Sequence, residues 1–496
     1  MTIPLVDKFL NTITMYRLVL YGLGALAIIS IVLALFGILP FSPWAMLVSL
    51  IILLAFCFGT NVLLSQLSGQ PLNIESADIT ALILFFILVP PTSGMDMALV
   101  AGTAFLAMIS KHVFALQRKH IFNPAAIALV IMGVFGSGLG IWWVATPYLL
   151  PLVLILAFFV VRKIRRFPLF FSFLFAACAM LLITGLQSGA SIIEILSQSF
   201  VSYPLLFLGG IMLTEPLTTP PTKKLQTVYG AVVGVLFGLQ FHLGPFYSTP
   251  ELAIVLGNIF SYIVSPKEKL KLALASSRRL SADIYEFVFS SPNKLLFKAG
   301  QYLEWTLPRF FFDDRGNRRY FTIASSPTEH EIRIGVRVSN KPSRFKKALL
   351  EMKAGETIWA SQLAGDFVLP NDVHKKLVFI AGGIGITPFR SMLKYIIDVK
   401  EQRDIVLLYA CITKEYFVYQ DIFNEAAAAS GVKTVFLPTD TDGYLTPERL
   451  AAEVPDFKER IFYLSGPISM VNAYQRLLLS LHVARSQIMK DYFPGF

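Results

Sequence analysis

The first half of the chain alternates long apolar runs with short polar segments. Ten runs lie at about 17–39, 43–65, 79–92, 95–110, 123–138, 145–161, 168–185, 200–214, 225–241 and 250–264. Several are shorter than the roughly 20 residues that an upright helix needs to cross a bilayer. The proline-interrupted stretches ALILFFILVPPTS and FNPAAIALV predict broken helices whose ends line a buried site, with irregular ends of ordinary helices as the alternative. Residues 1–266 are therefore predicted to form a polytopic α-helical membrane bundle of about ten transmembrane helices.

The spacing of apolar positions changes after residue 266. Short β-rich runs such as IYEFVFSS, QYLEWTLP and IRIGVRVS, separated by turn residues, predict a small antiparallel β-barrel over 267–370. From 371 to 496 the order becomes strand, glycine-rich turn and helix, as in KLVFIAGGIGITPFRSMLKYI. This alternation predicts an α/β domain with a parallel sheet and flanking helices.

The distribution of charge supports this division. Of 43 Lys and Arg and 32 Asp and Glu, residues 1–266 hold only 11 and 7. The mean hydropathy of +0.63 and the hydrophobic content of 55% therefore average a membrane half and a soluble half. The net charge of +11 fits basic loops against anionic lipid, so we expect membrane lipid, and no nucleic acid, as a partner.

The basic residues of the membrane half also predict its orientation. They occur before the first run and after the fourth, sixth, eighth and tenth, at Lys8, Arg17, Lys111, Arg118, Lys119, Arg162, Lys163, Arg165, Arg166, Lys223, Lys224, Lys267 and Lys269. The alternate loops, including GSGLGIWW and LQSGASIIE, contain no Lys or Arg. The positive-inside rule then predicts a multi-pass protein of the cytoplasmic membrane with both termini in the cytoplasm. The first segment lacks a signal cleavage site and is expected to be a retained anchor.

Cysteine and histidine limit the choice of redox centre. The three cysteines form no C-x-x-C pair, so their spacing supports neither an iron–sulfur cluster nor a zinc site, and we expect no metal. A haem between transmembrane helices would need paired histidines on two helices, and the membrane half offers only His112, His120 and His242. We therefore expect organic cofactors.

The glycine-rich stretch AGGIGITP follows an apolar strand and opens a helix. Its glycines would let the backbone approach a diphosphate at a helix N-terminus, with a tight structural turn as the alternative. A later strand ends at the same edge of the sheet, where nucleotides bind. The candidate NAD(P)H-binding residues are Gly382, Gly383, Gly385, Thr387, Ser465, Gly466 and Pro467.

Residues 267–496 resemble the ferredoxin-NADP reductase superfamily. The R-x-[YF]-[ST] stretch that holds FAD in this family is matched by Arg319, Tyr320, Phe321 and Thr322 in NRRYFTIASS. The resemblance implies that the arginine binds the FAD diphosphate and that the aromatic residue packs on the ribityl and isoalloxazine region. It places the Thr322 hydroxyl near the flavin N5. Phe321 lacks the phenol hydroxyl that would add one flavin hydrogen bond.

The same resemblance implies three further roles. Ser343, in KPSRF, would supply a second diphosphate contact, and Ser465 would lie beside the nicotinamide, where a cysteine is often found. The chain ends in DYFPGF, so Phe496 would stack on the flavin face, with simple packing against the module as the alternative. The catalytic candidates are thus Thr322, Ser465 and Phe496.

Residues of about 15–265 resemble the ten-helix flavin-bearing subunit of the sodium-pumping NADH:quinone reductase and the Rnf complex. The resemblance rests on SADITALILFFILVPP, SKHVFALQRKHIFNPAAIALV, MLTEPLTTPPTKKLQTVYG and ELAIVLGNIF. Those subunits carry FMN joined through its phosphate to a threonine of an S-G-A-T motif on the outer side. The sodium-pumping form also holds riboflavin nearer the cytoplasm.

The stretch that corresponds to this motif is LQSGAS, which ends at Ser191. Serine replaces the threonine, and Gly185 stands where the modifying transferase usually finds aspartate. The resemblance therefore implies FMN at Ser191, joined covalently or held without a bond, with an empty loop as the remaining alternative. Riboflavin is a further candidate. Asn123 and the pair Thr214 and Glu215 are candidate polar contacts to a buried flavin or quinone, although Asn123 could also be a helix cap before Pro124.

These observations together predict a membrane oxidoreductase. Electrons would pass from cytoplasmic NAD(P)H through FAD to one or more flavins in the membrane domain and on to an extracytosolic acceptor, either a flavoprotein or a small molecule. Two other hypotheses remain from the residues. One is an NAD(P)H:quinone reductase, and the other is a redox-linked transporter of an ion or of flavin.

Overall fold

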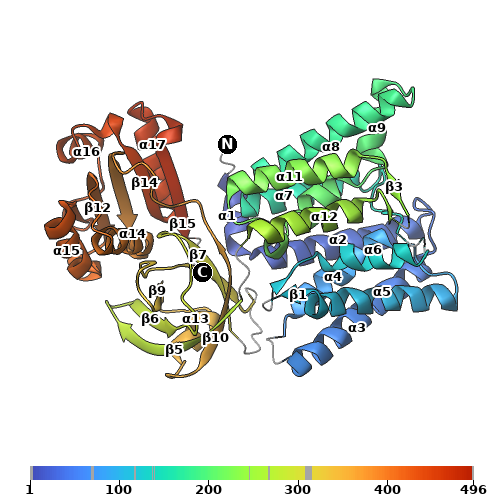
Figure 1. Cartoon of the computed structure of the whole chain (residues 1–496), viewed down its shortest axis with the longest axis horizontal. Coiled ribbons are helices and arrows are strands. Elements are labelled where there is room, and N and C mark those ends of the chain that lie inside the picture. The colour runs from blue at the N-terminus through green and yellow to red at the C-terminus, as the bar shows by residue number, and fades with distance from the viewer. Residues whose placement is uncertain are drawn as a thin grey trace. The chain divides into compact units, whose positions relative to one another are not determined.

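The computed structural model describes residues 4–68, 72–116, 119–136, 138, 140–244, 246–265, 269–307 and 316–493 (Figure 1). The chain divides into two compact units. The first comprises Met1–Lys269 with Pro308–Gly316 and is helical, and the second comprises Leu270–Leu307 with Asn317–Phe496 and contains the two main sheets. The domain limits expected from the sequence, at 266 and 370, stay predictions.

The helical unit places a helix at each of the ten apolar runs. A short helix α1 (Pro4–Thr12) precedes them. The others are α2 (Met15–Leu35), α3 (Pro43–Ser68), α4 (Ile74–Ile87), α5 (Gly94–Val113), α6 (Pro124–Val134), α7 (Leu150–Ile164), α8 (Phe167–Gln187), α9 (Ile192–Val201) with α10 (Leu205–Phe207) and η1 (Leu208–Met212), α11 (Lys223–Gly238) and α12 (Pro250–Val264). Two short hairpins, β1 (Ala115–Leu116) with β2 (Lys119–His120) and β3 (His242–Leu243) with β4 (Phe246–Tyr247), connect helices.

Among the described residues, four helices are long and apolar enough to cross a membrane, namely α2, α3, α5 and α8. A fifth span results if α9 and the helical segment Leu205–Met212, which are bent by 54° relative to each other, are counted as one. The prediction of ten helices is thus matched by helices at the expected places, whereas ten transmembrane spans are not shown. The remaining helices are too short to cross by themselves.

Helix α4 shows why a short apolar helix can end inside this unit. It is followed by Leu88 and Val89 and then by Pro90 and Pro91, and the two prolines cannot continue a helix. The exposed carbonyls at its end are bonded by a later segment, since Ile87 accepts from the Ile141 and Trp142 amides and Phe86 accepts from Val144. Its last turns are almost completely buried. Such a break is tolerated in an apolar environment only because the freed backbone groups find partners in the protein.

The basic residues gather at one end of the helical unit. Arg162 binds Asp7 of α1 with its Nε atom 2.9 Å from Oδ1, and Lys111 donates to Ser76 in the first turn of α4. Arg17 pairs with Glu75 in the same turn. Figure 1 shows α1 and β1 at this end and β3 and α9 at the other. The alternation of loops with and without Lys or Arg in the sequence therefore corresponds to two ends of one bundle.

Helices α8 and α11 approach each other closely because α11 carries small residues on its contact face. A Cβ atom on Gly230 would lie 2.4 Å from the Leu169 carbonyl oxygen, and one on Gly234 would lie 2.5 Å from that of Phe173. Small residues at such crossings let backbones approach where water provides no driving force for association.

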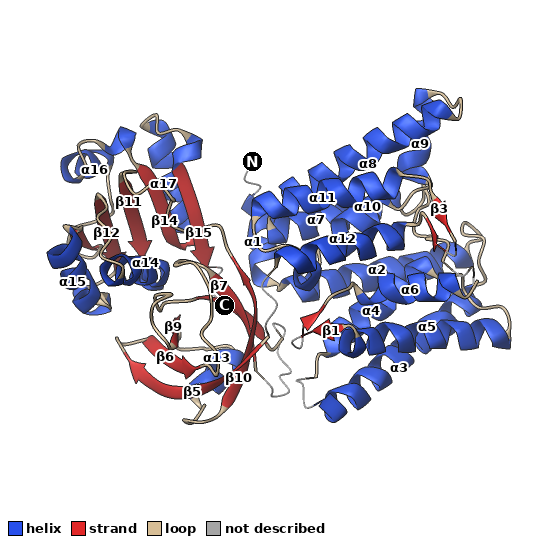
Figure 2. Cartoon of the chain, viewed as in Figure 1, coloured by secondary structure: helices blue, strands red, loops and turns tan. Residues whose placement is uncertain are grey.

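The second unit contains a curled antiparallel sheet and a parallel sheet (Figure 2). The antiparallel sheet has the strand order β8-β7-β10-β5-β6-β9. Helix α13 (Arg344–Leu350) connects β9 to β10 along the chain. Its strands are β5 (Leu270–Arg279), β6 (Ile284–Ser290), β7 (Tyr302–Thr306), β8 (Arg318–Thr322), β9 (Ile332–Arg337) and β10 (Thr357–Ala364). Strand β8 also contacts β9, which curls the sheet toward the predicted barrel.

The parallel sheet has the order β13-β12-β11-β14-β15. Its strands are β11 (Leu377–Gly382), β12 (Ile405–Cys411), β13 (Lys433–Pro438), β14 (Ile461–Pro467) and β15 (Ile488–Phe493). Helices α14 (Thr387–Asp398) and α15 (Gln420–Ser430) cover one face, and α16 (Pro447–Glu453) and α17 (Ile468–Ser480) cover the other. The central strands β11, β12 and β14 are almost continuously apolar and buried, as expected for a sheet with helices on both faces.

We expect Gly234→Ala to destabilise the helical unit. The added methyl group would overlap the α8 backbone and force the two helices apart, at a cost of about 1–3 kcal/mol. Gly102→Ala in α5 is the matched control, because a Cβ atom there meets no atom within 4 Å. Alanine has the higher helix propensity, so the control should be unchanged or slightly stabilised. Thermal unfolding of the detergent-solubilised chain measures both, and equal melting temperatures for the two variants would contradict this packing.

Candidate flavin and nucleotide sites

Strand β8 carries the predicted flavin stretch and presents it on two faces. Arg319 and Phe321 point to the side of α13, where the Phe345 ring lies 5.3 Å from the Arg319 guanidinium carbon and 6.0 Å from the Phe321 ring. Because side chains alternate along a strand, Tyr320 points to the opposite side. Its hydroxyl donates to Glu304 at 2.7 Å, and 44% of the residue is exposed. The two aromatic candidates therefore cannot pack on the same surface.

Arg319 is suited to hold a diphosphate. Its side chain is buried, with the residue 6% exposed, and its Nη1 atom donates to the Arg318 carbonyl at 2.7 Å. A guanidinium that is fixed by a backbone bond and by an aromatic ring presents further donors in a constant geometry, which suits phosphate oxygens. Ser343 caps α13 by accepting from the Lys346 amide at 3.4 Å. A fixed guanidinium and a serine hydroxyl suit the diphosphate of FAD, and the roles of Arg319 and Ser343 as its ligands stay predictions.

Thr322 ends β8 opposite Tyr302, and the residue is 4% exposed. Phe496, the third catalytic candidate besides Ser465, lies outside the described residues.

The glycine-rich turn joins β11 to α14 and lies against the end of β14. Gly383 has φ +52°, a conformation that favours glycine. A Cβ atom on Gly385 would lie 2.4 Å from the Ser465 carbonyl oxygen and 2.6 Å from Gly466. The two stretches that the sequence predicts for the nucleotide are thus in direct contact at the carboxyl edge of the sheet. Ser465 is fully buried, and the Thr387 hydroxyl donates to the Ile384 carbonyl at 3.2 Å, so that group serves the turn.

A largely buried ion pair, which no sequence motif indicates, joins the antiparallel sheet to the helix α14 that covers the parallel sheet. Arg390 of α14 donates to both carboxylate oxygens of Glu329, which follows β8, and to the Ala324 carbonyl at 3.0 Å. The neighbouring Ser391 hydroxyl donates to the Ser325 carbonyl at 2.6 Å. Burial raises the pKa of Glu329, but the hydrogen bond and charge of Arg390 outweigh it and hold that pKa below its usual value. The flavin strand and the nucleotide helix are therefore fixed relative to each other.

The helical unit contains a polar network at its basic end. Asn123 caps α6, donates from Nδ2 to Glu215 at 2.9 Å, and donates from its backbone amide to the Asn258 side chain at 2.8 Å. Asn258 in turn donates to the Tyr229 hydroxyl at 2.8 Å. Asn123 is thus both a helix cap and a member of a buried network. Thr214 instead donates to the Gly210 and Ile211 carbonyls of η1, the helix that precedes it.

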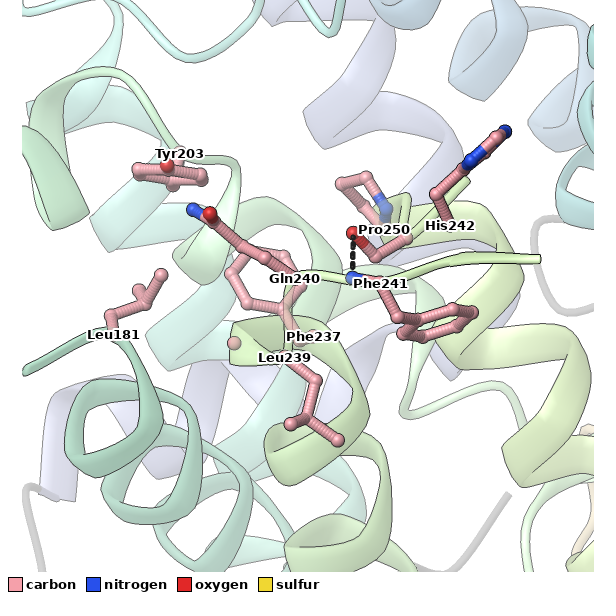
Figure 3. A pocket seen from close by; sticks show the side chains of 10 residues that line it. Leu181, Tyr203, Phe237, Leu239, Gln240, Phe241, His242 and Pro250 are labelled. Atoms are coloured by element: carbon pink, nitrogen blue, oxygen red, sulfur yellow. Dashed lines mark hydrogen bonds between the residues drawn. The ribbon is translucent and has the colours of Figure 1, made fainter. Parts of the chain in front are cut away.

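Ser191 lies at the end opposite the basic residues, at the start of α9. It caps α9 by accepting from the Glu194 amide at 3.3 Å, and it is exposed. Gly185, which replaces the expected aspartate, packs against Ile195, since a Cβ atom there would lie 2.7 Å from that side chain. The same end of the unit holds a pocket of about 500 Å³ (Figure 3). Its lining is largely apolar and aromatic, with Leu181, Tyr203, Phe237, Gly238, Leu239, Gln240, Phe241, His242, Ser248 and Pro250.

Two side-chain arrangements shape this pocket. The Tyr203 and Phe237 rings are 6.1 Å apart with an angle of 65° between their planes, and the His242 ring lies 4.3 Å from that of Tyr247. The Phe241 amide donates to the Ser248 hydroxyl at 3.2 Å, as the dashed line in Figure 3 shows.

Within the described residues, no group of three or more His, Cys, Asp or Glu is arranged to hold a metal ion.

Comparison with known proteins assigns the second unit. Residues 379–476 match the family model described as the oxidoreductase NAD-binding domain. The chain is 31% identical over 241 residues to the flavohemoprotein of Bacillus subtilis, with 46% of this chain and 60% of the relative covered. It is 27% identical over 210 residues to an NADPH oxidoreductase of Mycobacterium tuberculosis, with 40% and 54% covered. The matched part thus spans somewhat more than half the length of these relatives.

A solved structure of the flavohem-like FAD/NAD-binding domain of nitric oxide dioxygenase from Vibrio cholerae is 21% identical, with a TM-score of 0.40. The alignment covers 45% of this chain and 98% of that domain. The sequence matches and the two sheets define the second unit as a ferredoxin-NADP reductase-like FAD/NAD-binding module. This is the module of an FAD-dependent NAD(P)H oxidoreductase. The resemblance of the helical unit to a membrane flavin subunit stays a prediction.

We expect Arg319→Ala to weaken FAD binding by roughly 10- to 100-fold. Removal of the guanidinium deprives the diphosphate of a charge-assisted contact worth about 1.5–3 kcal/mol. Lys347→Ala is the control, because it removes a positive charge from the exposed side of α13. FAD content after purification and titration of the apoprotein with FAD measure the effect. Full occupancy in Arg319→Ala would show that the diphosphate lies elsewhere.

We expect Arg390→Leu to destabilise the module by about 2 kcal/mol, since it removes the bidentate partner of Glu329 and leaves that carboxylate only the Arg333 guanidinium at 3.2 Å and the Ser326 amide at 2.6 Å. Glu329 has a lowered pKa in the folded chain, so the pair contributes fully above the unfolded value of about 4.3 and is lost as pH falls through the folded value. The difference between variant and parent should therefore shrink in acid. Thermal release of FAD, followed by fluorescence from pH 3 to pH 8, measures it.

Lys394→Leu provides the comparison for this prediction. Lys394 lies on the same helix and pairs with Asp398 at the surface, where a salt bridge contributes about 1 kcal/mol or less. A loss in Arg390→Leu no larger than that in Lys394→Leu would contradict the anchoring role of the buried pair.

Proposed function

We propose that the chain carries electrons from cytoplasmic NAD(P)H through FAD to one or more flavins in the membrane domain, and on to an extracytosolic acceptor. The observation that carries the proposal is the polarity of the helical unit, which has its basic residues at one end and Ser191 with an aromatic pocket at the other. A reductase module in the same chain supplies the source of electrons.

The side of NAD(P)H oxidation follows from chain direction. Helix α12 begins at Pro250 beside the β3–β4 hairpin and runs toward the basic end, after which the chain enters the reductase module at Leu270 (Figure 1). By the positive-inside rule the basic end faces the cytoplasm, where nicotinamide cofactors are found. This supports a cytoplasmic module and a multi-pass membrane domain, in which the shorter apolar helices cross as part of the bundle.

The chain's own residues would bind and orient the two cofactors. FAD, when bound, accepts two electrons together and releases them singly. Arg319 and Ser343 would hold its diphosphate, Phe321 would pack against it, and Thr322 would lie near the reacting ring. The turn at Gly385 packs against Gly466, so both stretches would lie beside the diphosphate and nicotinamide of NAD(P)H.

The aromatic pocket supports a flavin at the outer end. Its volume of about 500 Å³ and its Tyr203 and Phe237 walls suit a flat conjugated ring, and Gln240 supplies an amide for ring carbonyls. Ser191 stands at the head of α9, the helix that leads to Tyr203. An FMN joined to Ser191, or held beside it without a bond, would place its ring in or near this pocket.

A second carrier is needed because the hydrocarbon core of about 30 Å is too thick for one efficient electron transfer. The network of Asn123, Glu215 and Asn258 offers hydrogen-bonding groups for a second flavin, with riboflavin as a candidate. The same groups suit quinone carbonyls, so an NAD(P)H:quinone reductase is the second candidate function. Quinone reduction would then occur at the basic end and require no flavin at Ser191.

We expect Ser191→Ala to remove or weaken the outer flavin while FAD remains. If a phosphoester forms, the denatured parent should keep a fluorescent flavin that this variant lacks, whereas partial loss is expected for a flavin held without a bond. Ser197→Ala in α9 is the control, because Ser197 lies outside the motif, is exposed, and donates its hydroxyl to the Glu194 carbonyl at 2.9 Å.

The function is tested in sealed vesicles that contain the chain. NADH on the side of the module should reduce an impermeant acceptor on the other side, and Ser191→Ala should lower the rate. FAD reduction by NADH with no flavin in the helical unit and no electron delivery across the bilayer would reject the proposal. Quinone reduction under those conditions would favour the second candidate.

A further inference from the structure

We propose that Gly335, in the middle of β9, is a positioning residue for hydride transfer from NAD(P)H to FAD. Because this position has no side chain, the glycine-rich turn can lie directly on the antiparallel sheet, and the distance between the two cofactors is set by that contact. The inference concerns only the reduction of FAD. It therefore goes beyond the proposed electron path and does not depend on the acceptor.

Strand β9 faces the part of the module that contains the parallel sheet. It presents Arg333, Gly335 and Arg337 on one face, because side chains alternate along a strand and the residues between these three are buried. Arg333 lies 3.2 Å from Glu329, the carboxylate that is also bound by α14. The Arg337 guanidinium carbon lies 5.7 Å from the ring centre of Tyr416, in the loop that follows β12. The parallel-sheet part is thus held on both sides of Gly335.

Between these two contacts the glycine-rich turn lies against β9. A Cβ atom on Gly335 would lie 2.8 Å from the Thr387 Cγ2 atom and 3.0 Å from the Ile384 Cδ1 atom. It would also lie 3.1 Å from the hydroxyl oxygen of Tyr419, the residue before α15. Carbon atoms in favourable contact are about 3.5–4.0 Å apart, so a side chain at this position would overlap the turn.

The neighbouring side chains have little freedom to move aside. Thr387 is 2% exposed, and its hydroxyl donates to the Ile384 carbonyl at 3.2 Å, so rotation of this stiff β-branched side chain would break that bond. Tyr419 is buried and its backbone has φ +62°. Glu286, the partner of Gly335 on β6, is fully buried and closes the same face. An added methyl group would therefore displace the turn itself.

Displacement of the turn alters the reaction geometry because the two cofactors are bound on either side of this contact. FAD is assigned to β8 of the antiparallel sheet, and NAD(P)H is assigned to the turn. Hydride transfer breaks the C4–H bond of the nicotinamide and forms the N5–H bond of the flavin, which yields NAD(P)⁺ and reduced FAD. The reacting atoms have to be about 3–3.5 Å apart, and a misplacement of about 1 Å lowers the rate by roughly 100-fold.

The kinetic test follows FAD reduction in the purified full-length chain by stopped flow, with whichever of NADH and NADPH reduces the parent faster. We expect Gly335→Ala to lower the rate constant of hydride transfer by roughly tenfold or more. The slow step should show a normal kinetic isotope effect with nucleotide deuterated at C4. FAD content and the Kd of the nucleotide should stay within threefold of the parent values.

Ile334→Val is the control for a loss of stability. Ile334 is fully buried and lies next to Gly335 on the opposite face of the same strand. Removal of one methylene group from this core position should lower the melting temperature and leave the rate of hydride transfer unchanged.

A compensating substitution tests the contact directly. Thr387→Ser removes the Cγ2 atom that the new methyl group would overlap and keeps the hydroxyl. The loss of rate caused by Gly335→Ala should be at least threefold smaller in the Thr387→Ser background. Hydrogen–deuterium exchange of the FAD-bound chain without nucleotide should be faster at the amides of 383–387 in Gly335→Ala than in the parent, and the double variant should lie between them.

The parent's rate of hydride transfer in Gly335→Ala would overturn the inference. A loss that Thr387→Ser does not lessen, or one that Ile334→Val reproduces, would overturn it as well. These outcomes are distinct from failure of the proposed function, which is rejected by missing electron delivery across the bilayer even when FAD is reduced normally. If neither nucleotide reduces FAD in the parent, both fail, since no hydride transfer exists for Gly335 to position.

Discussion

The energetic cost of placing a charge in an apolar core constrains this chain more than any single contact. In the helical unit, Lys and Arg are confined to the segments that meet at one end, where partners such as Asp7 for Arg162 and Ser76 for Lys111 are available. As a consequence, the two ends of the bundle differ in charge. The proposed side of NAD(P)H oxidation and the proposed side of the electron acceptor both follow from this difference between the two ends.

Much of the architecture could be predicted because it depends on the local spacing of apolar, polar and glycine residues. The ten apolar runs correspond to helices, and the change to short alternating runs and then to AGGIGITP corresponds to an antiparallel and a parallel sheet. The number of membrane spans was less certain from the sequence, since several apolar helices are short and their ends depend on distant partners. Nothing in the apolar run 79–92 indicates that the Ile87 and Phe86 carbonyls will accept hydrogen bonds from the segment 141–144.

The site shows the same division between local and distant determinants. The glycines and Arg319 could be found because diphosphate binding requires a permissive backbone and a fixed cation close together in sequence. The pair of Arg390 and Glu329 could not, since the two residues lie on different elements and each is unremarkable in its own segment. Its place near a helix end makes Thr214 a candidate contact to a buried flavin or quinone. Its hydroxyl instead donates to the Gly210 carbonyl of the preceding helix, and only the side-chain orientation reveals this bond.

The end of α4 has a consequence for how the protein is made. Its last carbonyls depend on the segment 141–144, which leaves the ribosome only after α5 and α6 have been synthesised. In the proposed membrane domain, α4 would lack partners for these carbonyls until that segment has been made, and its lasting insertion would have to wait for the later helices. Insertion by groups of helices, rather than one helix at a time, follows from the membrane location that we propose.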